Sequence, residues 1–180
     1  MIIAELEQLR YPIGQFQAPE YITDTHIKLW IKDIELLPSQ MRLAVAGMND
    51  EQLDTPYRPD GWTVRQTVHH VADSHINGYT RIKLALTEDN PTIKPYEEHL
   101  WAELPDSKLD VDMSLRMLDS VHTRWAEILR CINKVQFERT FYHPGNQKSY
   151  AIDYHTGMYS WHGRHHVAHI ENLKLRMAWT

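Results

Sequence analysis

Twelve histidines occur in the 180-residue chain, and five of them fall within 15 residues near its carboxyl end. These five are His155, His162, His165, His166 and His169. Neutral imidazole is the commonest protein ligand for transition metals, and it is also the side chain that titrates near neutral pH. The cluster therefore predicts either a metal site or a group of pH-sensitive side chains.

Two of these histidines share the apolar face of a helix predicted over residues 153–177. His162 and His166 fall in the middle of that face on a helical wheel. They are four residues apart, so both imidazoles can reach one ion. A buried imidazole nitrogen without a partner costs roughly 1–3 kcal/mol, and a coordinated divalent cation removes that cost. The pair His165 and His169 lies at the edge of the face and is the second choice.

A third ligand has to come from another helix, because a catalytic zinc site usually has three protein ligands and one open position. Residues 68–75 offer His69, His70 and His75. The periodicity of the neighbouring valines favours His75, whereas small side chains around His70 would leave room for an ion. The wheel leaves this choice open. No HExxH, Walker A or GxGxxG motif occurs, so no catalytic acid or base is identified.

Four helical patterns can position these side chains. The first covers about residues 25–47, and Pro38 inside it predicts a kink or break near Leu37. The second opens at Thr63, which can form a capping box with Gln66. It ends before a long connection over residues 90–109, and connections of that length tend to be functional.

The third helix follows Asp110 or Asp112, either of which can cap it, and the fourth covers about residues 153–177. Between them, residues 143–146 predict a turn, and no strand is expected. The patterns predict an all-α four-helix bundle, with an irregular all-α domain as the alternative. The predicted boundaries are a single domain over residues 1–180, an irregular N-terminal arm over 1–24 and the bundle over 25–177.

Composition excludes several classes of protein. The net charge is −5 without any basic run, which argues against nucleic acid or an anionic membrane as the main partner. No apolar stretch approaches the roughly 20 residues that span a bilayer. A single cysteine, Cys131, excludes a disulfide framework, and the amino-terminal residues lack the features of a signal peptide. The expected location is therefore the cytoplasm.

Several segments together resemble the YfiT group of the DinB superfamily. One segment runs from Tyr57 to Gln66 and contains the sequence Arg-Pro-Asp-Gly-Trp. Another contains two adjacent histidines, His69 and His70. The matching segments are residues 57–66, 69–75, 94–96, 142–144 and 161–170. The likeness extends over nearly the whole chain.

The resemblance implies an up-down-down-up four-helix bundle that forms a homodimer. It also implies one divalent ion per subunit, zinc or nickel, bound by three histidines at one end of the bundle. Carried over by position, these ligands are His70, His162 and His166. The last two agree with the wheel, whereas the first replaces the wheel's preference for His75.

Relatives in this superfamily are metal-dependent hydrolases or transfer low-molecular-weight thiols such as bacillithiol. An ion held by three neutral imidazoles keeps its charge and can activate either water or a thiol. We therefore expect a metal-dependent hydrolase or S-transferase with a small-molecule substrate, and Tyr96, Glu97 and Glu98 are candidate lid residues. The alternatives are a non-catalytic metal-binding or stress-response module, and a histidine-based pH switch.

Overall fold

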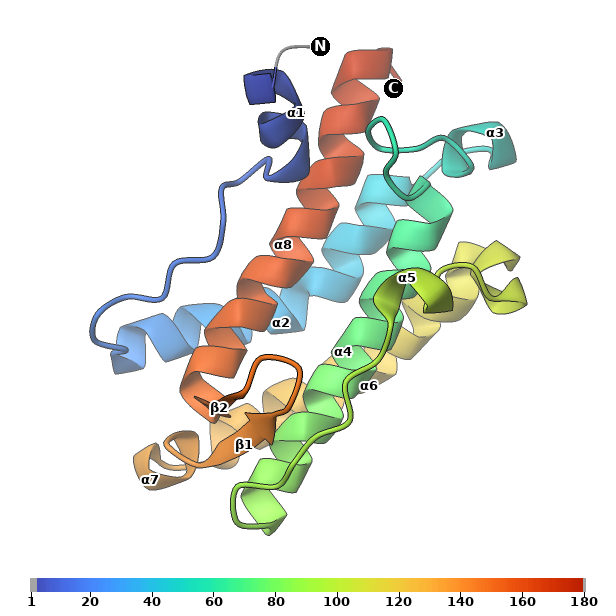
Figure 1. Cartoon of the computed structure of the whole chain (residues 1–180). Coiled ribbons are helices and arrows are strands. Elements are labelled where there is room, and N and C mark those ends of the chain that lie inside the picture. The colour runs from blue at the N-terminus through green and yellow to red at the C-terminus, as the bar shows by residue number, and fades with distance from the viewer. Residues whose placement is uncertain (1–2, 180) are drawn as a thin grey trace.

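The computed structural model describes residues 3–179 and contains four long helices (Figure 1). The long helices are α2 (Asp24–Val45), α4 (Val64–Thr87), α6 (Val111–Cys131) and α8 (Ile152–Met177). The shorter elements are α1 (Ile3–Arg10), α3 (Asp50–Leu53), α5 (Glu98–Trp101), η1 (Pro105–Lys108), α7 (Lys134–Phe137), β1 (Thr140–His143) and β2 (Lys148–Ala151). The predicted all-α bundle is confirmed.

The long helices run up, down, down and up (Figure 1). One apolar cluster joins the carboxyl-terminal halves of α2 and α8 to the amino-terminal halves of α4 and α6, which fixes these directions. Because α4 and α6 point the same way, residues 88–110 must return along the length of the bundle. This connection carries α5 and η1 over the outside of α4.

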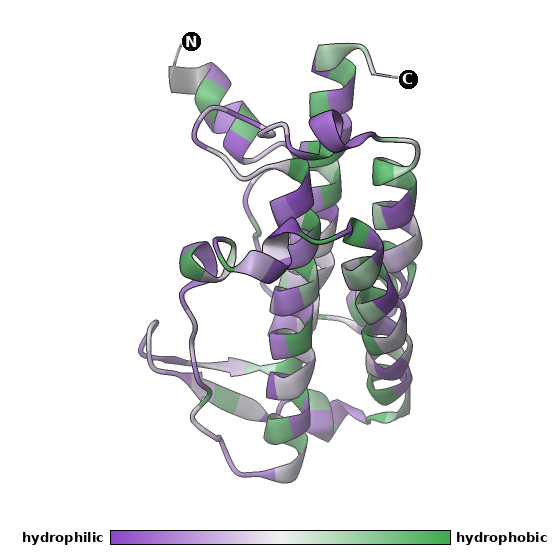
Figure 2. Cartoon of the chain, turned by 90° about the vertical axis from the view of Figure 1, so that its right-hand side faces the viewer, coloured by the Kyte–Doolittle hydropathy of each residue, from purple (hydrophilic) through white to green (hydrophobic). Residues whose placement is uncertain are grey.

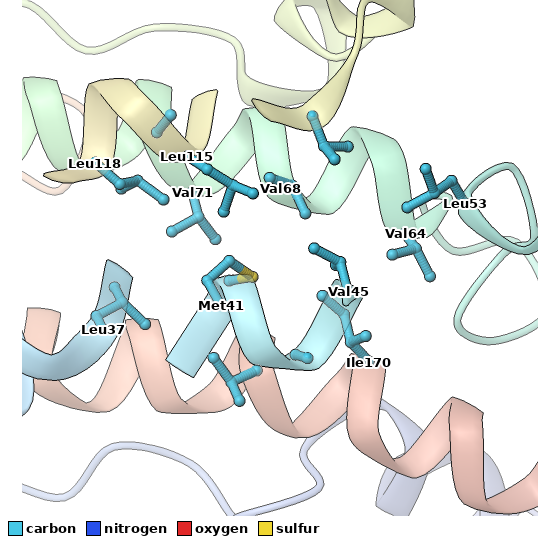
Figure 3. Close-up of a cluster of buried hydrophobic side chains, with 14 of the residues drawn as sticks. Leu37, Met41, Val45, Leu53, Val64, Val68, Val71, Leu115, Leu118 and Ile170 are labelled. Atoms are coloured by element: carbon cyan, nitrogen blue, oxygen red, sulfur yellow. The ribbon is translucent and has the colours of Figure 1, made fainter. Parts of the chain in front are cut away.

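Two apolar clusters fill the bundle at different heights. The first includes Met41, Val68, Leu115 and Ile170 (Figure 3), and the second is built around Trp125 and the hairpin. On α4, α6 and α8, histidines occupy the interval between the residues of one cluster and those of the other. The histidines of that interval are His75, His122, His162, His165 and His166. The core is therefore apolar at both heights and imidazole-rich between them.

The start of α4 follows from local chemistry that the sequence predicts. The Thr63 hydroxyl accepts a hydrogen bond from the Gln66 N–H at 3.1 Å, and the Gln66 side chain accepts one from the Thr63 N–H at 3.0 Å. Arg65 is buried and pairs with Asp54 at 2.6 Å and with Asp50 at 2.7 Å. These contacts fix the first turns of α4, from which His70 projects.

A kink or break is expected near Leu37, and the helix is not broken there, since α2 continues through Pro38 to Val45. Proline lacks an N–H, so the carbonyl of Ile34, four residues earlier, loses its usual helical donor. His122 of α6 supplies a replacement, because its Nδ1 donates a hydrogen bond to this carbonyl inside the bundle. The proline is tolerated because a neighbouring helix satisfies the carbonyl that it frees.

Two predictions about the shorter elements were wrong. Residues 3–10 of the arm form α1 rather than irregular chain, and residues 140–151 form an antiparallel hairpin around the predicted turn. Backbone hydrogen bonds tie the long connection to this hairpin, from Ile93 N–H to the Tyr142 carbonyl at 3.0 Å and from Tyr142 N–H to the Pro91 carbonyl at 2.9 Å. The hairpin and the connection therefore form one wall beside α4 and α8.

Hydrophilic and hydrophobic residues are interleaved along the long helices (Figure 2). Within residues 3–179, no helix combines the length and the apolar character that crossing a membrane requires.

Candidate metal centre

The three predicted ligands lie together between α4 and α8. Nitrogen atoms of His70, His162 and His166 are all within 4.8 Å of one another. The Nε2 atoms of His70 and His162 are 3.4 Å apart, and two imidazoles bound tetrahedrally to one zinc ion have nitrogens about 3.3 Å apart. The donor set therefore fits a single divalent ion.

The group lies in the second turn of α4 and near the middle of α8. It is thus at one end of α4 but not at the end of α8. The side chains of His70 and His166 are buried, and that of His162 is half-buried. Trp62, from the loop before α4, covers His70 with its ring centre 4.3 Å away.

Burial keeps all three imidazoles neutral. It lowers the pKa of His70 to about 4 and holds the pKa values of His162 and His166 well below their ordinary value, with neighbouring histidines adding to the effect at the latter two. A neutral imidazole has one nitrogen with a free lone pair, which is the form that binds metal. The three side chains are therefore in the ligating protonation state at neutral pH.

The partners of His166 decide which of its nitrogens is free. His169 Nε2 lies 3.1 Å from the carbonyl oxygen of Arg10, which can only accept, so this nitrogen carries the proton. His169 Nδ1 is then an acceptor, 3.4 Å from His166 Nδ1. The hydrogen-bond network thus assigns the His166 proton to Nδ1 and leaves Nε2 for an ion.

His75, which periodicity favoured as a ligand, instead lies behind His162. Its Nε2 is 3.1 Å from His162 Nδ1, and its side chain is fully buried. With His162 Nε2 facing His70, Nδ1 of His162 donates to His75, which fixes the ring orientation. His122 stacks on His75 at 4.9 Å between ring centres. The preference for His75 was wrong because periodicity measures burial rather than access to an ion.

The other candidate histidines have structural partners. His69 lies 2.7 Å from the Ser114 hydroxyl through Nδ1 and 3.1 Å from the Leu109 carbonyl through Nε2. His165 stacks on Trp161 at 4.5 Å. The second-choice pair, His165 and His169, is not part of the group that can hold an ion.

A cavity of about 310 Å³ opens beside His162. The long connection contributes Tyr96 and Glu98 to its wall, and α4 contributes Arg81. Burial raises the pKa of Glu98 above its ordinary value, so its carboxyl group can exchange a proton nearer neutral pH. A larger hollow of about 680 Å³, lined by Arg65 and Asp50, contains none of the three histidines.

Glu98 and Arg81 are the site residues that the sequence did not identify as such. Glu98 was expected only as a lid residue, and Arg81 carried no signal because it is one charged residue on a helix. Glu98 lies beside His162 because the connection folds back along α4, and Arg81 shares the cavity with His162 because α8 packs against α4.

Comparison with known proteins agrees with this architecture. Residues 33–170 match the family model of the DinB superfamily. A Bacillus cereus protein is 56% identical over 176 residues, covering 97% of this chain and 100% of its own. A Bacillus mycoides protein is 55% identical over 176 residues with the same coverage. Both carry the name "Putative metal-dependent hydrolase".

A solved structure matches over the whole bundle. It is YfiT from Bacillus subtilis, described as "a probable metal-dependent hydrolase with an unusual four-helix bundle topology". It has a TM-score of 0.94 and 48% identity, covering 96% of this chain and 99% of that one. The family match, the relatives and the shared bundle show that this chain belongs to the DinB superfamily.

Proposed function

We propose that the protein is a metal-dependent enzyme in which His70, His162 and His166 bind one divalent ion, zinc or nickel. The observation that carries the proposal is the convergence of three neutral imidazoles, one of which, His162, lines a cavity of about 310 Å³. An ion held by three neutral ligands retains its charge and lowers the pKa of a bound water or thiol. The cavity gives a substrate room beside it.

Hydrolysis of a small molecule is the first candidate reaction. Glu98 lines the same cavity as His162, and its raised pKa suits a group that accepts a proton from water and returns it to a leaving group. Tyr96 brings a hydroxyl to the same wall, and burial raises its pKa, so it stays protonated and can donate to a substrate oxygen. The names of the relatives support this reading.

Transfer of a low-molecular-weight thiol is the second candidate. The cavity wall also contains Phe141, Tyr150 and Met158. Such polarisable, apolar side chains suit a sulfur nucleophile and an apolar electrophile. In this reaction the substrate supplies the nucleophile, and the protein orients it.

A non-catalytic metal-binding module is less well supported. A structural zinc site is closed by four protein ligands, whereas the metal-capable group among residues 3–179 contains three. The predicted homodimer and cytoplasmic location stay predictions, and light scattering of the purified protein would test the first.

The test uses protein loaded with zinc or with nickel, beside a His162→Ala, His166→Ala double variant. One assay follows hydrolysis of a panel of aryl esters and amides, and the other follows conjugation of monochlorobimane with and without bacillithiol. We expect one of the two activities to require both the metal and the histidine pair. Equal rates in the wild type and the double variant would refute the proposal.

A Glu98→Gln variant separates the two reactions. Loss of a proton acceptor lowers a hydrolytic rate by roughly 10²–10⁴-fold. Thiol transfer does not need that acceptor, so conjugation in this variant should stay close to the wild-type rate.

A further inference from the structure

We propose that Arg81 binds a carboxylate group of the substrate, and that the cavity beside His162 therefore takes an elongated small acid whose reactive end reaches the metal. The inference rests on the proposed function, since it concerns the same site.

Arg81 forms no hydrogen bond or ion pair within residues 3–179, although its charge partly offsets the rise that burial causes in the pKa of Glu98. Its Nε atom is buried without a hydrogen bond, and among residues 3–179 its guanidinium group forms no ion pair. Arg65 is satisfied by Asp50 and Asp54, and Arg139 by the carbonyls of Ala85 and Glu88. The Nε atom of Arg58 is also buried without a partner, but its guanidinium group donates to the Pro59 carbonyl at 2.9 Å. A buried N–H group without an acceptor is costly, although Arg81 as a whole is half-buried. A ligand anion would supply the missing acceptor.

The position of Arg81 directs it toward the cavity. It lines the cavity together with His162 and His143. Its charge helps to lower the pKa of His143 and of the buried His155, although burial is the larger cause for both. Both imidazoles are therefore neutral at neutral pH, which leaves Arg81 as the fixed positive charge of the wall.

Arg81 and the metal ligands also set the length of the occupant. Arg81 follows His70 by eleven residues on α4, which is a rise of about 16 Å along the helix. Side chains of a helix lean toward its amino terminus, and Arg81 lines the same cavity as His162. A molecule that touches both must be extended, with its acid at one end.

A carboxylate fits better than a phosphate. The planar guanidinium group forms two parallel hydrogen bonds with a carboxylate. Glu98 lines the same cavity, so a dianionic phosphate would meet a second negative charge there. A monoanion is repelled less.

The experiment compares two thiols of equal length with cobalt-loaded protein. The pair is 6-mercaptohexanoate and 6-mercapto-1-hexanol, and the sulfur-to-cobalt absorption band reports binding of either one at the metal. We expect the wild type to bind the acid at least about tenfold more tightly than the alcohol. In Arg81→Met this preference should disappear because the acid binds more weakly, while the alcohol binds as before. Arg116→Met, an exposed arginine of α6, is the matched control and should keep the preference.

Equal binding of the two thiols by the wild type would overturn the inference, as would equal weakening of both in Arg81→Met. Calorimetric titration of the metal-free protein with hexanoate and with 1-hexanol tests Arg81 without the ion, and only hexanoate binding should depend on Arg81. If no cobalt band forms while this dependence persists, the proposed metal chemistry fails and the acid site stands. If the band forms and hexanoate binds equally well with and without the Arg81 side chain, the acid site fails and the proposed metal chemistry stands.

Discussion

Two groups of histidines lie inside the bundle and differ in whether their nitrogens converge on one point. The outer group is His70, His162 and His166, and the inner group is His75, His122 and His155. Every member has a pKa lowered chiefly by burial. Each inner histidine is committed to a protein partner, which is His162 for His75, the Ile34 carbonyl for His122 and the Gly78 carbonyl for His155.

The outer histidines instead turn nitrogens toward one another. Burial and a low pKa thus describe both groups equally and identify neither as a site. Single nitrogens without a partner also occur in the inner group, at His75 Nδ1 and His122 Nε2. Convergence of nitrogens on one point is what distinguishes a candidate metal centre from a polar part of the core.

The largest effect should come from removing outer ligands. In His162→Ala or His166→Ala, bound metal after dialysis should fall from one ion per chain to near zero, because two imidazoles hold an ion too weakly. Elemental analysis measures this. The inner control is His155→Gln, which keeps a donor for the Gly78 carbonyl and should retain the metal. Metal loss in this control as well would remove the distinction between the groups.

Lowering the pH should destabilise the fold through the inner group of histidines. Burial lowers the pKa of His122 to about 4 and of His155 to about 3. In the unfolded chain both imidazoles titrate at about pH 6.5. Below that pH the unfolded chain therefore binds more protons than the folded chain. The free energy of unfolding should fall as the pH drops from about 6.5 to 4, on the order of 3 kcal/mol for His122 alone.

Urea unfolding in the presence of a chelator measures this dependence. The control is His122→Asn, which keeps an N–H for the Ile34 carbonyl but does not titrate. Its stability should depend less on pH, and parallel curves for variant and wild type would contradict the assignment.

A smaller effect on metal affinity is expected from the hydrogen bond between His75 of the inner group and His162 of the outer group. His75→Phe keeps the ring volume but removes the acceptor for His162 Nδ1. Loss of such a partner typically lowers metal affinity by about 10–100-fold, which competition with a chromophoric chelator measures. His75→Gln places an amide oxygen near the same position and should recover part of the affinity. If both variants bind metal as the wild type does, the inner group has no influence on the outer one.

The smallest effect is expected at Pro38. Replacing a proline within a helix by alanine usually stabilises it by about 3 kcal/mol. Here the new N–H competes with His122 for the Ile34 carbonyl, and a buried donor without an acceptor costs about 1–3 kcal/mol. The two effects should nearly cancel, so urea unfolding of Pro38→Ala should differ from the wild type by about 1 kcal/mol or less. A full gain would show that His122 does not depend on this carbonyl.

The parts of the fold that depend on local sequence could be predicted. Helical periodicity gave the four long helices, and the Thr63–Gln66 capping box gave the start of α4. The strands were missed because each is four residues long and pairs only with the other strand and the long connection. The α1 helix was missed because the prolines and glycine that follow it suggested irregular chain throughout.

The candidate site was predictable only in part. The i, i+4 spacing brings His162 and His166 to one face, whichever tertiary contacts follow. The choice between His70 and His75 depends on where α8 crosses α4, which no local pattern contains. Glu98 is brought to the cavity by a chain reversal over residues 88–110, and Arg81 faces it only because α8 and the hairpin pack beside α4, so the roles of both depend on tertiary structure.

The chain reversal over residues 88–110 places the cavity wall and the metal-binding histidines on different elements. The imidazoles belong to the rigid helices α4 and α8, whereas residues 88–110 and the hairpin supply most of the opposite wall. Substitutions in this wall can change which molecule is accepted without disturbing the residues that converge between α4 and α8. One bundle can in this way diversify its substrates over evolution while keeping its reactive centre intact.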